Sequence, residues 1–262
     1  MQQARLLCLV GLLTLFDAIA DVPTRPPPSD ARVLGSERQP SQADQDYLRG
    51  VQLAHGEGVP QDYTQAAECY LSAAKKGHVG AQYNLAYLYE HGLGVARDFK
   101  QAAAWYRKAA LQGDAEAQNN LGVLCATGRG VPHKDVEAVH WYRLAADQSD
   151  AEAMSNLGMM YLQGRGVKAD LIQAFQWIRK AAENGYAAAQ NNLALMYANG
   201  QAVAQDYVWA YAWLDIAADK LSACTQVRDQ IAKEMTPEQI QRAQTRAEIK
   251  RTEIFQRANK TK

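Results

Sequence analysis

Five copies of one pattern, spaced 36 residues apart, constrain the fold of this chain more than any other feature of its sequence. A loop glycine recurs at Gly56, Gly92, Gly128, Gly164 and Gly200. An alanine pair recurs at Ala73–Ala74, Ala109–Ala110, Ala145–Ala146, Ala181–Ala182 and Ala217–Ala218. A fixed period of this length, without insertions, is typical of a solenoid, in which stacked units share one continuous core.

Each copy predicts two helices joined by a short glycine loop. In the second copy, Ala81 and Leu85 have helical spacing, and Gly92 interrupts the helix because glycine extends a helix poorly. The second helix resumes after Asp98, an N-cap residue type, and carries Trp105 toward the core. Neither helix can bury its apolar face alone, so neighbouring copies must pack together.

The repeated residues resemble the Sel1-like repeat (SLR) family, relatives of the tetratricopeptide repeat, over about residues 45–222. The resemblance implies an all-α fold: a right-handed α/α superhelix of five helix-turn-helix repeats whose first helices line a concave surface. We place the repeats at about 43–78, 79–114, 115–150, 151–186 and 187–222. Cys69 and Cys125 replace aromatic residues of the pattern, and Ala202 replaces the second loop glycine of the fifth copy.

Residues outside the repeats predict an exported protein with a covered C-terminal end. An apolar run after Arg5 and the small residues up to Ala20 predict a signal peptide over 1–20, cleaved after Ala20; an uncleaved apolar anchor is the alternative. Residues 21–41 predict a Pro-rich linker. Residues 223–262 predict capping helices, one through Val227, Ile231 and Met235 and one that starts at Thr236. We therefore expect a periplasmic or secreted protein without a membrane span after cleavage.

No residue pattern indicates catalysis, a metal or a cofactor, so we expect a protein that is not an enzyme and has neither. His55 and His91 recur one repeat apart, but no carboxylate or thiol completes a metal site. Cys69 and Cys125 are expected to be buried free thiols. Glu116 and Glu152 could form a catalytic carboxylate pair, although charge at a helix start more often complements the helix dipole. The repeats carry no basic field, so nucleic acid is not an expected partner.

By the resemblance to tetratricopeptide units, three rows of the first helices should face a partner-binding groove. An apolar row is Val51, Tyr87, Val123, Met159 and Leu195. A second row is Tyr47, Tyr83, Asn119, Ser155 and Asn191. A third row is Asn84, Asn120, Asn156 and Asn192. An exposed apolar row predicts protein docking, unless curvature or the C-terminal helices cover it. The asparagines could instead brace adjacent helices. Trp105, Trp141, Trp177 and Trp213 are expected in the core between units.

These features predict a non-catalytic periplasmic scaffold for protein–protein interaction, with another protein as its partner. By family analogy, the most specific interpretation is an immunity-type protein that binds and neutralises a secreted lipase (phospholipase) toxin. The alternatives are an envelope-assembly adaptor, or an enzyme or binder acting on cell-wall fragments or β-lactams. An endoplasmic-reticulum adaptor of a eukaryote is disfavoured, because no retention signal is present.

Overall fold

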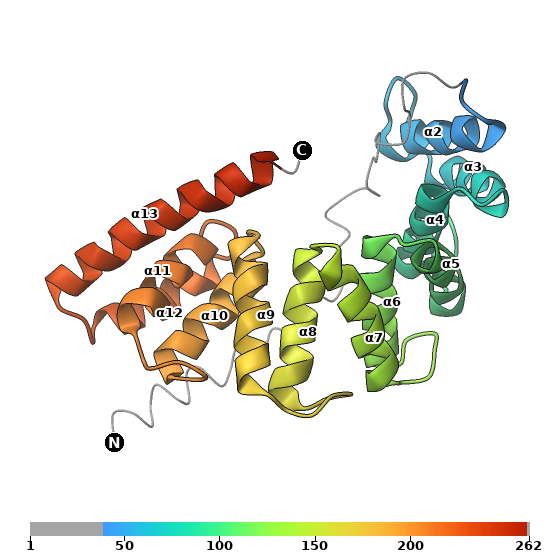
Figure 1. Cartoon of the computed structure of the whole chain (residues 1–262). Helices are drawn as coiled ribbons and strands as arrows, with labels where there is room; N and C mark the ends of the chain where they lie inside the picture. The colour runs from blue at the N-terminus through green and yellow to red at the C-terminus, as the bar shows by residue number, and fades with distance from the viewer. Residues whose placement is uncertain (1–38, 261–262) are drawn as a thin grey trace. The chain divides into compact units, whose positions relative to one another are not determined.

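A computed structural model describes residues 39–260, which are helical and contain no strand (Figure 1). The predicted signal peptide and nearly all of the predicted linker lie outside these residues. The described chain divides into two compact units, with the boundary after Ala145.

Successive antiparallel helices build the N-terminal unit. Its helices are α2 (Gln42–His55), α3 (Tyr63–Lys75), α4 (Val79–His91), α5 (Phe99–Leu111) and α6 (Ala115–Thr127), followed by α7 (Asp135–Asp147), which runs across the boundary. Each helix from α2 to α5 packs on the next one in the chain. The predicted helix–loop–helix repeat is therefore confirmed in this unit.

The C-terminal unit continues the same pattern and ends differently. Its helices are α8 (Ala151–Gln163), α9 (Leu171–Glu183), α10 (Ala187–Asn199), α11 (Tyr207–Ala217), α12 (Ala223–Ala232) and α13 (Pro237–Lys260). Helix α12 stops at Ala232, so Met235 lies beyond it and the prediction of one helix through Met235 was wrong. None of the helices between residues 39 and 260 has the length and apolar character needed to cross a membrane.

The predicted caps define the ends of the helices. The loop glycines Gly56, Gly92, Gly128, Gly164 and Gly200 all end a first helix in the left-handed conformation. Asp62, Asp98, Asp170 and Asp206 each accept backbone N–H groups at the start of a second helix. Ser41 forms a capping box with Asp44, and Thr236 forms one with Gln239. Caps of this kind satisfy N–H groups that have no partner within the helix.

In the second and third repeats, the second loop glycine rests on the preceding repeat. A Cβ atom on Gly94 would collide with the carbonyl group of Tyr63, and one on Gly130 would collide with that of Phe99. Both glycines have positive φ, which favours a residue without Cβ. Ala202 holds the corresponding position in the fifth repeat with φ of 63°, an uncommon conformation for alanine.

Small residues allow the two helices of a repeat to approach closely. A Cβ atom on Gly50 would lie 2.6 Å from the Tyr70 ring, and one on Gly122 would lie 2.7 Å from the Tyr142 ring. Trp105, Trp141 and Trp213 are buried, as predicted for core residues. The corresponding residues Trp177 and Cys69 are only half-buried, contrary to the predictions of a core tryptophan and a buried thiol.

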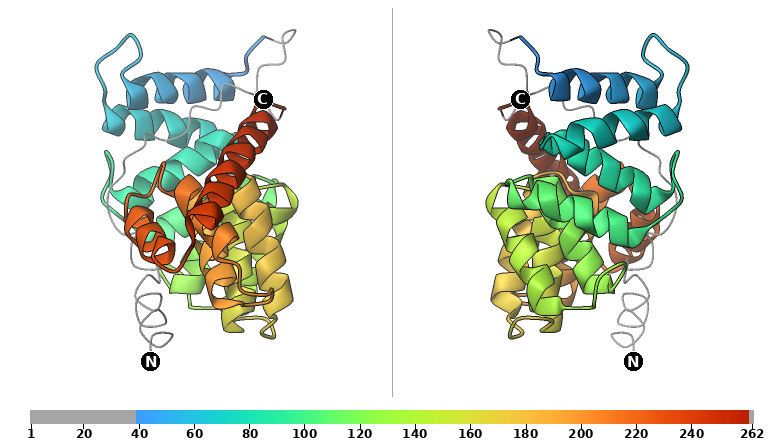
Figure 2. Two further views of the ribbon diagram at one scale, coloured as in Figure 1. Left: turned by 90° about the vertical axis from the view of Figure 1, so that its left-hand side faces the viewer. Right: turned by 90° about the vertical axis from the view of Figure 1, so that its right-hand side faces the viewer.

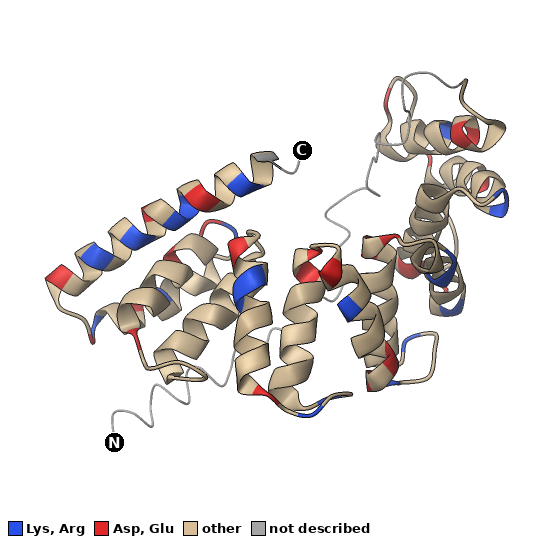
Figure 3. Ribbon diagram, in the orientation of Figure 1, with Lys and Arg blue, Asp and Glu red and all other residues tan. Residues whose placement is uncertain are grey.

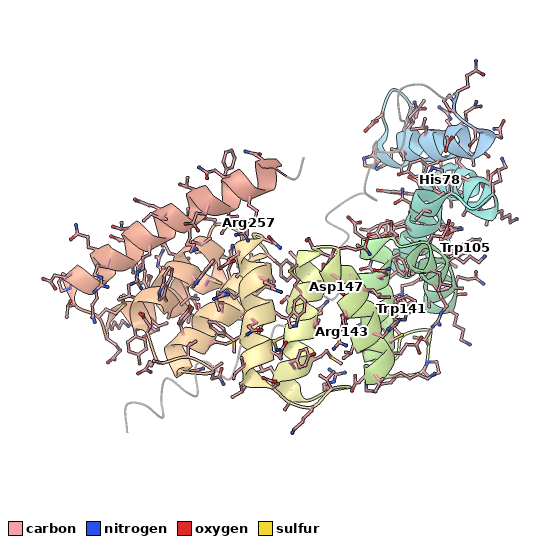
Figure 4. All side chains as sticks on the ribbon, viewed as in Figure 1. His78, Trp105, Trp141, Arg143, Asp147 and Arg257 are labelled. Carbon is pink, nitrogen blue, oxygen red and sulfur yellow. The ribbon has the colours of Figure 1, made fainter. Side chains whose placement is uncertain are left out.

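Helix α13 covers the last repeat helix. Figures 1 and 2 show α13 lying along α11. Ala243 is fully buried on this contact, beside Val208 and Tyr211 of α11. At its far end, Arg257 lies 3.5 Å from Glu183, so α13 also reaches the connection between α9 and α10 (Figure 4).

Candidate partner-binding surface

The structure separates the predicted groove residues by their exposure. Six of them are buried: Tyr47, Val51, Asn84, Asn119, Ser155 and Asn191. Eight of them are half-buried: Tyr83, Tyr87, Asn120, Val123, Asn156, Met159, Asn192 and Leu195. A buried side chain offers no surface to a partner, so only the second group can contribute to a binding surface. Four of these residues belong to each compact unit.

In the N-terminal unit, α4 and α6 meet through a polar contact. Asn120 of α6 donates from Nδ2 to the Tyr83 hydroxyl of α4 at 3.5 Å. The Tyr83 ring packs 5.6 Å from the ring of Tyr106, measured between centroids. Burial, together with the neighbouring Glu116 carboxylate, raises the pKa of Tyr83 well above its usual value. The Tyr83 hydroxyl therefore keeps its proton at neutral pH and can act as a hydrogen-bond donor.

A carboxylate beside this contact is held in place by a buried tyrosine. The Tyr106 hydroxyl donates to Glu90 Oε2 at 2.8 Å. Burial raises the pKa of Tyr106 well above its usual value, with the Glu90 charge as a further cause. A neutral tyrosine therefore orients the Glu90 side chain at the half-exposed end of α4.

Tyr87 is fixed by a histidine of its own helix. The rings of Tyr87 and His91 stack with centroids 4.1 Å apart. His91 Nδ1 lies 2.9 Å from the Tyr87 carbonyl oxygen, and a carbonyl only accepts, so Nδ1 carries the proton. The half-buried Tyr87 ring is thus held as an ordered surface group.

In the C-terminal unit, asparagines of α10 contact α8 and α12. Asn192 Nδ2 lies 3.7 Å from the Met159 sulfur, and Asn191 Oδ1 accepts from the Cys224 thiol at 3.5 Å. The contacts of Asn120 with Tyr83 and of Asn192 with Met159 agree with the interpretation of the third row as braces between adjacent helices. The apolar residues Met159 and Leu195 remain half-buried beside them.

The cysteines of the described residues lack the surroundings that activate a thiol. Cys69, Cys125 and Cys224 are free thiols, and burial raises the pKa of each, that of Cys125 to about 11. A thiol in this state is a poor nucleophile at neutral pH. Among residues 39–260, no group of three His, Cys, Asp or Glu side chains could hold a metal ion.

Sequence reasoning missed the pair formed by Glu90 and Tyr106. Tyr106 recurs as Tyr70 and Tyr142, so its period could have identified it. Glu90 has no such counterpart, because Ala54, Ala126, Leu162 and Ala198 stand at its place in the other repeats. A search for repetition passes over a residue that occurs in one repeat alone.

Comparison with known families identifies the repeats. The family model for the Sel1 repeat matches residues 47–78, 79–114, 115–150, 151–186 and 187–220. Among curated proteins, none has a sequence that matches this chain.

Several solved structures are similar. The protective antigen c5321 of uropathogenic Escherichia coli, described as displaying an SLR fold, is 37% identical over 86% of this chain, with a TM-score of 0.77. The chain spans about half of that protein, 49% of its length. A Sel1 repeat protein from Oxalobacter formigenes is 36% identical over 71% of this chain and 76% of its own, with a TM-score of 0.64.

Proposed function

The chain belongs to the Sel1 repeat family, and on this basis we propose that it is a non-catalytic scaffold that binds another protein through its first helices. The observation that carries the proposal is a pair of half-buried apolar side chains on the first helices of each unit. These are Tyr87 and Val123 in the N-terminal unit, and Met159 and Leu195 in the C-terminal unit. Aromatic side chains, methionine and other apolar groups of this kind are typical of protein interfaces.

The most specific form of the proposal is an immunity-type protein in the bacterial periplasm that neutralises a secreted lipase. It is supported by the analogy with exported members of the family and by the signal peptide expected from the sequence. The direct test is a titration calorimetry measurement between the chain from Asp21 onward and a secreted lipase encoded beside it. We expect tight binding with one lipase per chain and loss of lipase activity in the complex.

The proposed binding surface is tested by substituting one of its apolar residues with lysine in each compact unit. The double variant Tyr87→Lys/Met159→Lys should weaken binding at least a hundredfold, because desolvated apolar contacts near the centre of an interface carry much of its affinity (about 2 kcal/mol or more per anchor). The matched control is Leu111→Lys/Ile172→Lys, which makes the same chemical change at exposed second-helix positions, 72% and 61% exposed. Equal affinities for the two double variants would reject the assigned surface.

Two other outcomes would redirect the proposal. Binding of an envelope-assembly protein in place of the lipase, with the same sensitivity to Tyr87→Lys/Met159→Lys, would keep the scaffold and reject toxin neutralisation. Turnover of a β-lactam or a cell-wall fragment that one point substitution abolishes would show that the protein is an enzyme.

A further inference from the structure

In the last repeat, a helix without lysine or arginine is covered by helices that carry arginine. Helix α11 carries aromatic side chains and Asp215 but no lysine or arginine. Arg228 of α12 lies over the Tyr211 ring at 5.7 Å, and its Nη1 lies 2.7 Å from Asp215 Oδ1. Helix α12 is therefore held on α11 by a guanidinium group that contacts both a tyrosine ring and a carboxylate.

Helix α13 repeats this chemistry along α11. Arg246 lies over the Trp209 ring at 4.4 Å, 3.7 Å from the Asp206 carboxylate. Arg251 pairs with Asp219 at 2.8 Å. The blue bands along α13 in Figure 3 mark these and the other basic residues of the helix. An arginine-bearing helix is thus the natural complement of an aromatic, acidic repeat helix in this protein.

Helices α4 and α6 also lack cations, and α4, like α11, carries aromatic side chains. Neither contains lysine or arginine, and each carries one glutamate, Glu90 on α4 and Glu116 on α6. In contrast, α5 carries Lys100, Arg107 and Lys108. The positive charge of these two repeats therefore belongs to their second helices and loops.

The half-exposed side chains of α4 and α6 form one connected patch. Tyr83, Tyr87 and Glu90 follow one another at helical spacing on α4. The bond from Asn120 to Tyr83 joins them to α6, where Val123 lies on the same side as Asn120. Tyr106 holds the Glu90 carboxylate from below, and no lysine or arginine of the described residues pairs with it. This patch, the tyrosine–glutamate surface, consists of Tyr83, Tyr87, Glu90, Glu116, Asn120 and Val123.

We propose that the tyrosine–glutamate surface binds an arginine-bearing segment of the partner protein. The proposal rests on the proposed scaffold function and adds the charge of the bound segment. Arginine suits the surface better than lysine, because its flat guanidinium stacks on an aromatic ring and pairs with a carboxylate at once. An acidic segment would be repelled by Glu90 and Glu116 and would find no cation on either helix.

The test uses a synthetic peptide and the chain from Asp21 onward. The probe is a fluorescent peptide in which arginines are spaced by Ala and Ser, and its neutral twin replaces every arginine with citrulline. Fluorescence anisotropy should show that the arginine peptide binds, with affinity that falls as salt is raised, and that the citrulline peptide does not. Equal binding of the two peptides, or no binding of either, would overturn the proposal.

Two charge-matched double variants locate the site. Glu90→Gln/Glu116→Gln should weaken binding of the arginine peptide about tenfold, since each exposed ion pair contributes modestly. Glutamine keeps an oxygen that can accept from Tyr106, so the fold should survive, and circular dichroism checks this. The control Glu57→Gln/Glu68→Gln removes the same charge from exposed positions of the same unit. Equal losses in both variants would show unspecific attraction and reject the site.

The two proposals can fail separately. If the lipase binds and Tyr87→Lys/Met159→Lys weakens it while the arginine peptide does not bind, the scaffold stands and the arginine preference falls. If the peptide binds through Glu90 and Glu116 while the lipase does not bind, the surface stands and the lipase assignment falls.

Discussion

His78 starts α4 with an imidazole where the next two repeats use Asp114 and Asp150. Its Nδ1 accepts from the Ala81 N–H at 3.1 Å, so this nitrogen must be unprotonated (Figure 4). The ring stacks on Tyr47 with centroids 4.2 Å apart, and Nε2 lies 3.6 Å from Asp44 Oδ1. Burial lowers the pKa of His78 below its usual 6.5, although the Asp44 charge acts in the opposite direction.

We expect the cap at His78 to make stability depend on pH. The folded state binds a proton at this site less readily than the unfolded state, so stability is full above about pH 6.5 and is lost as the pH falls below it. Urea unfolding at neutral and mildly acidic pH should show a loss of about 1 kcal/mol, the usual worth of a cap. The variant His78→Asn keeps an uncharged cap and should lack this loss. The same pH slope in both proteins would contradict the assignment.

At the scale of single residues, repetition decides what the sequence reveals. Asp62 and Asp98 were predicted as caps because an acceptor side chain stands just before a periodic helix. His78 was not, because its capping role depends on a tautomer and on burial against Tyr47. The burial of Asn84 was also not predicted, because an asparagine in the sequence does not show whether its side chain lies on the surface or in the core.

Between elements, a glutamine joins three of the first helices, α4, α6 and α10, to the helix before each. Gln82, Gln118 and Gln190 donate from Nε2 to the carbonyls of Ala74, Ala110 and Ala182 at 3.2, 3.0 and 3.2 Å. Gln82 also accepts from Gln112 at 2.7 Å. These bonds add a second donor to carbonyls in the last turn of a helix, which also accept from the N–H groups of Gly77, Gly113 and Gly185.

Met154 interrupts this series, and we expect Met154→Gln to restore it. The side chain is 6% exposed, and its sulfur lies 3.6 Å from Asn184 Nδ2, where Gln82 accepts from Gln112. Glutamine should donate to the Ala146 carbonyl and accept from Asn184, which should raise the free energy of unfolding by about 1 kcal/mol. Thermal unfolding measures the change. Met154→Leu, which adds no hydrogen bond, is the control and should leave stability almost unchanged, whereas an equal gain in both variants would exclude the hydrogen bond as the cause.

The helix boundaries were predictable where a cap fixes them. Thr236 and Gln239 predicted the start of α13, and the structure has their reciprocal bonds. The end of α12 was not predictable in this way, because Val227, Ile231 and Met235 keep helical spacing after the helix has stopped at Ala232. Met235 instead packs beside the contact between α11 and α13, and spacing alone cannot distinguish these two arrangements.

For the whole molecule, the repeats were predictable and the placement of the last helix was not. The period of 36 residues specifies neighbours along the chain. Helix α13 instead returns to α11 and reaches Glu183, contacts that lie outside the period. Such contacts depend on side chains such as Arg251 and Ala243, which follow no repeated pattern.

Removal of residues 237–262 should loosen the C-terminal unit selectively. Val208 and Tyr211 are 8% and 7% exposed beneath α13, and burial of an apolar side chain such as valine stabilises by about 1.5–3 kcal/mol. Because repeat proteins are stabilised mainly by nearest-neighbour contacts, we expect faster hydrogen exchange in α10 and α11 and unchanged exchange in α3 to α5. Exchange that accelerates equally in both sets of helices would show that the chain unfolds as one cooperative unit.

The contact of two repeat loops with the preceding helix also bears on how such a chain can evolve. Gly94 rests on Tyr63 and Gly130 rests on Phe99 through backbone atoms, so the fit does not depend on which side chains either repeat carries. A duplication or deletion of one 36-residue segment in the gene would rejoin the same backbone surfaces. Recombination can therefore lengthen or shorten the protein by whole repeats. The side chains of the added or lost repeat then change the binding surface, while the backbone contact between neighbouring repeats stays the same.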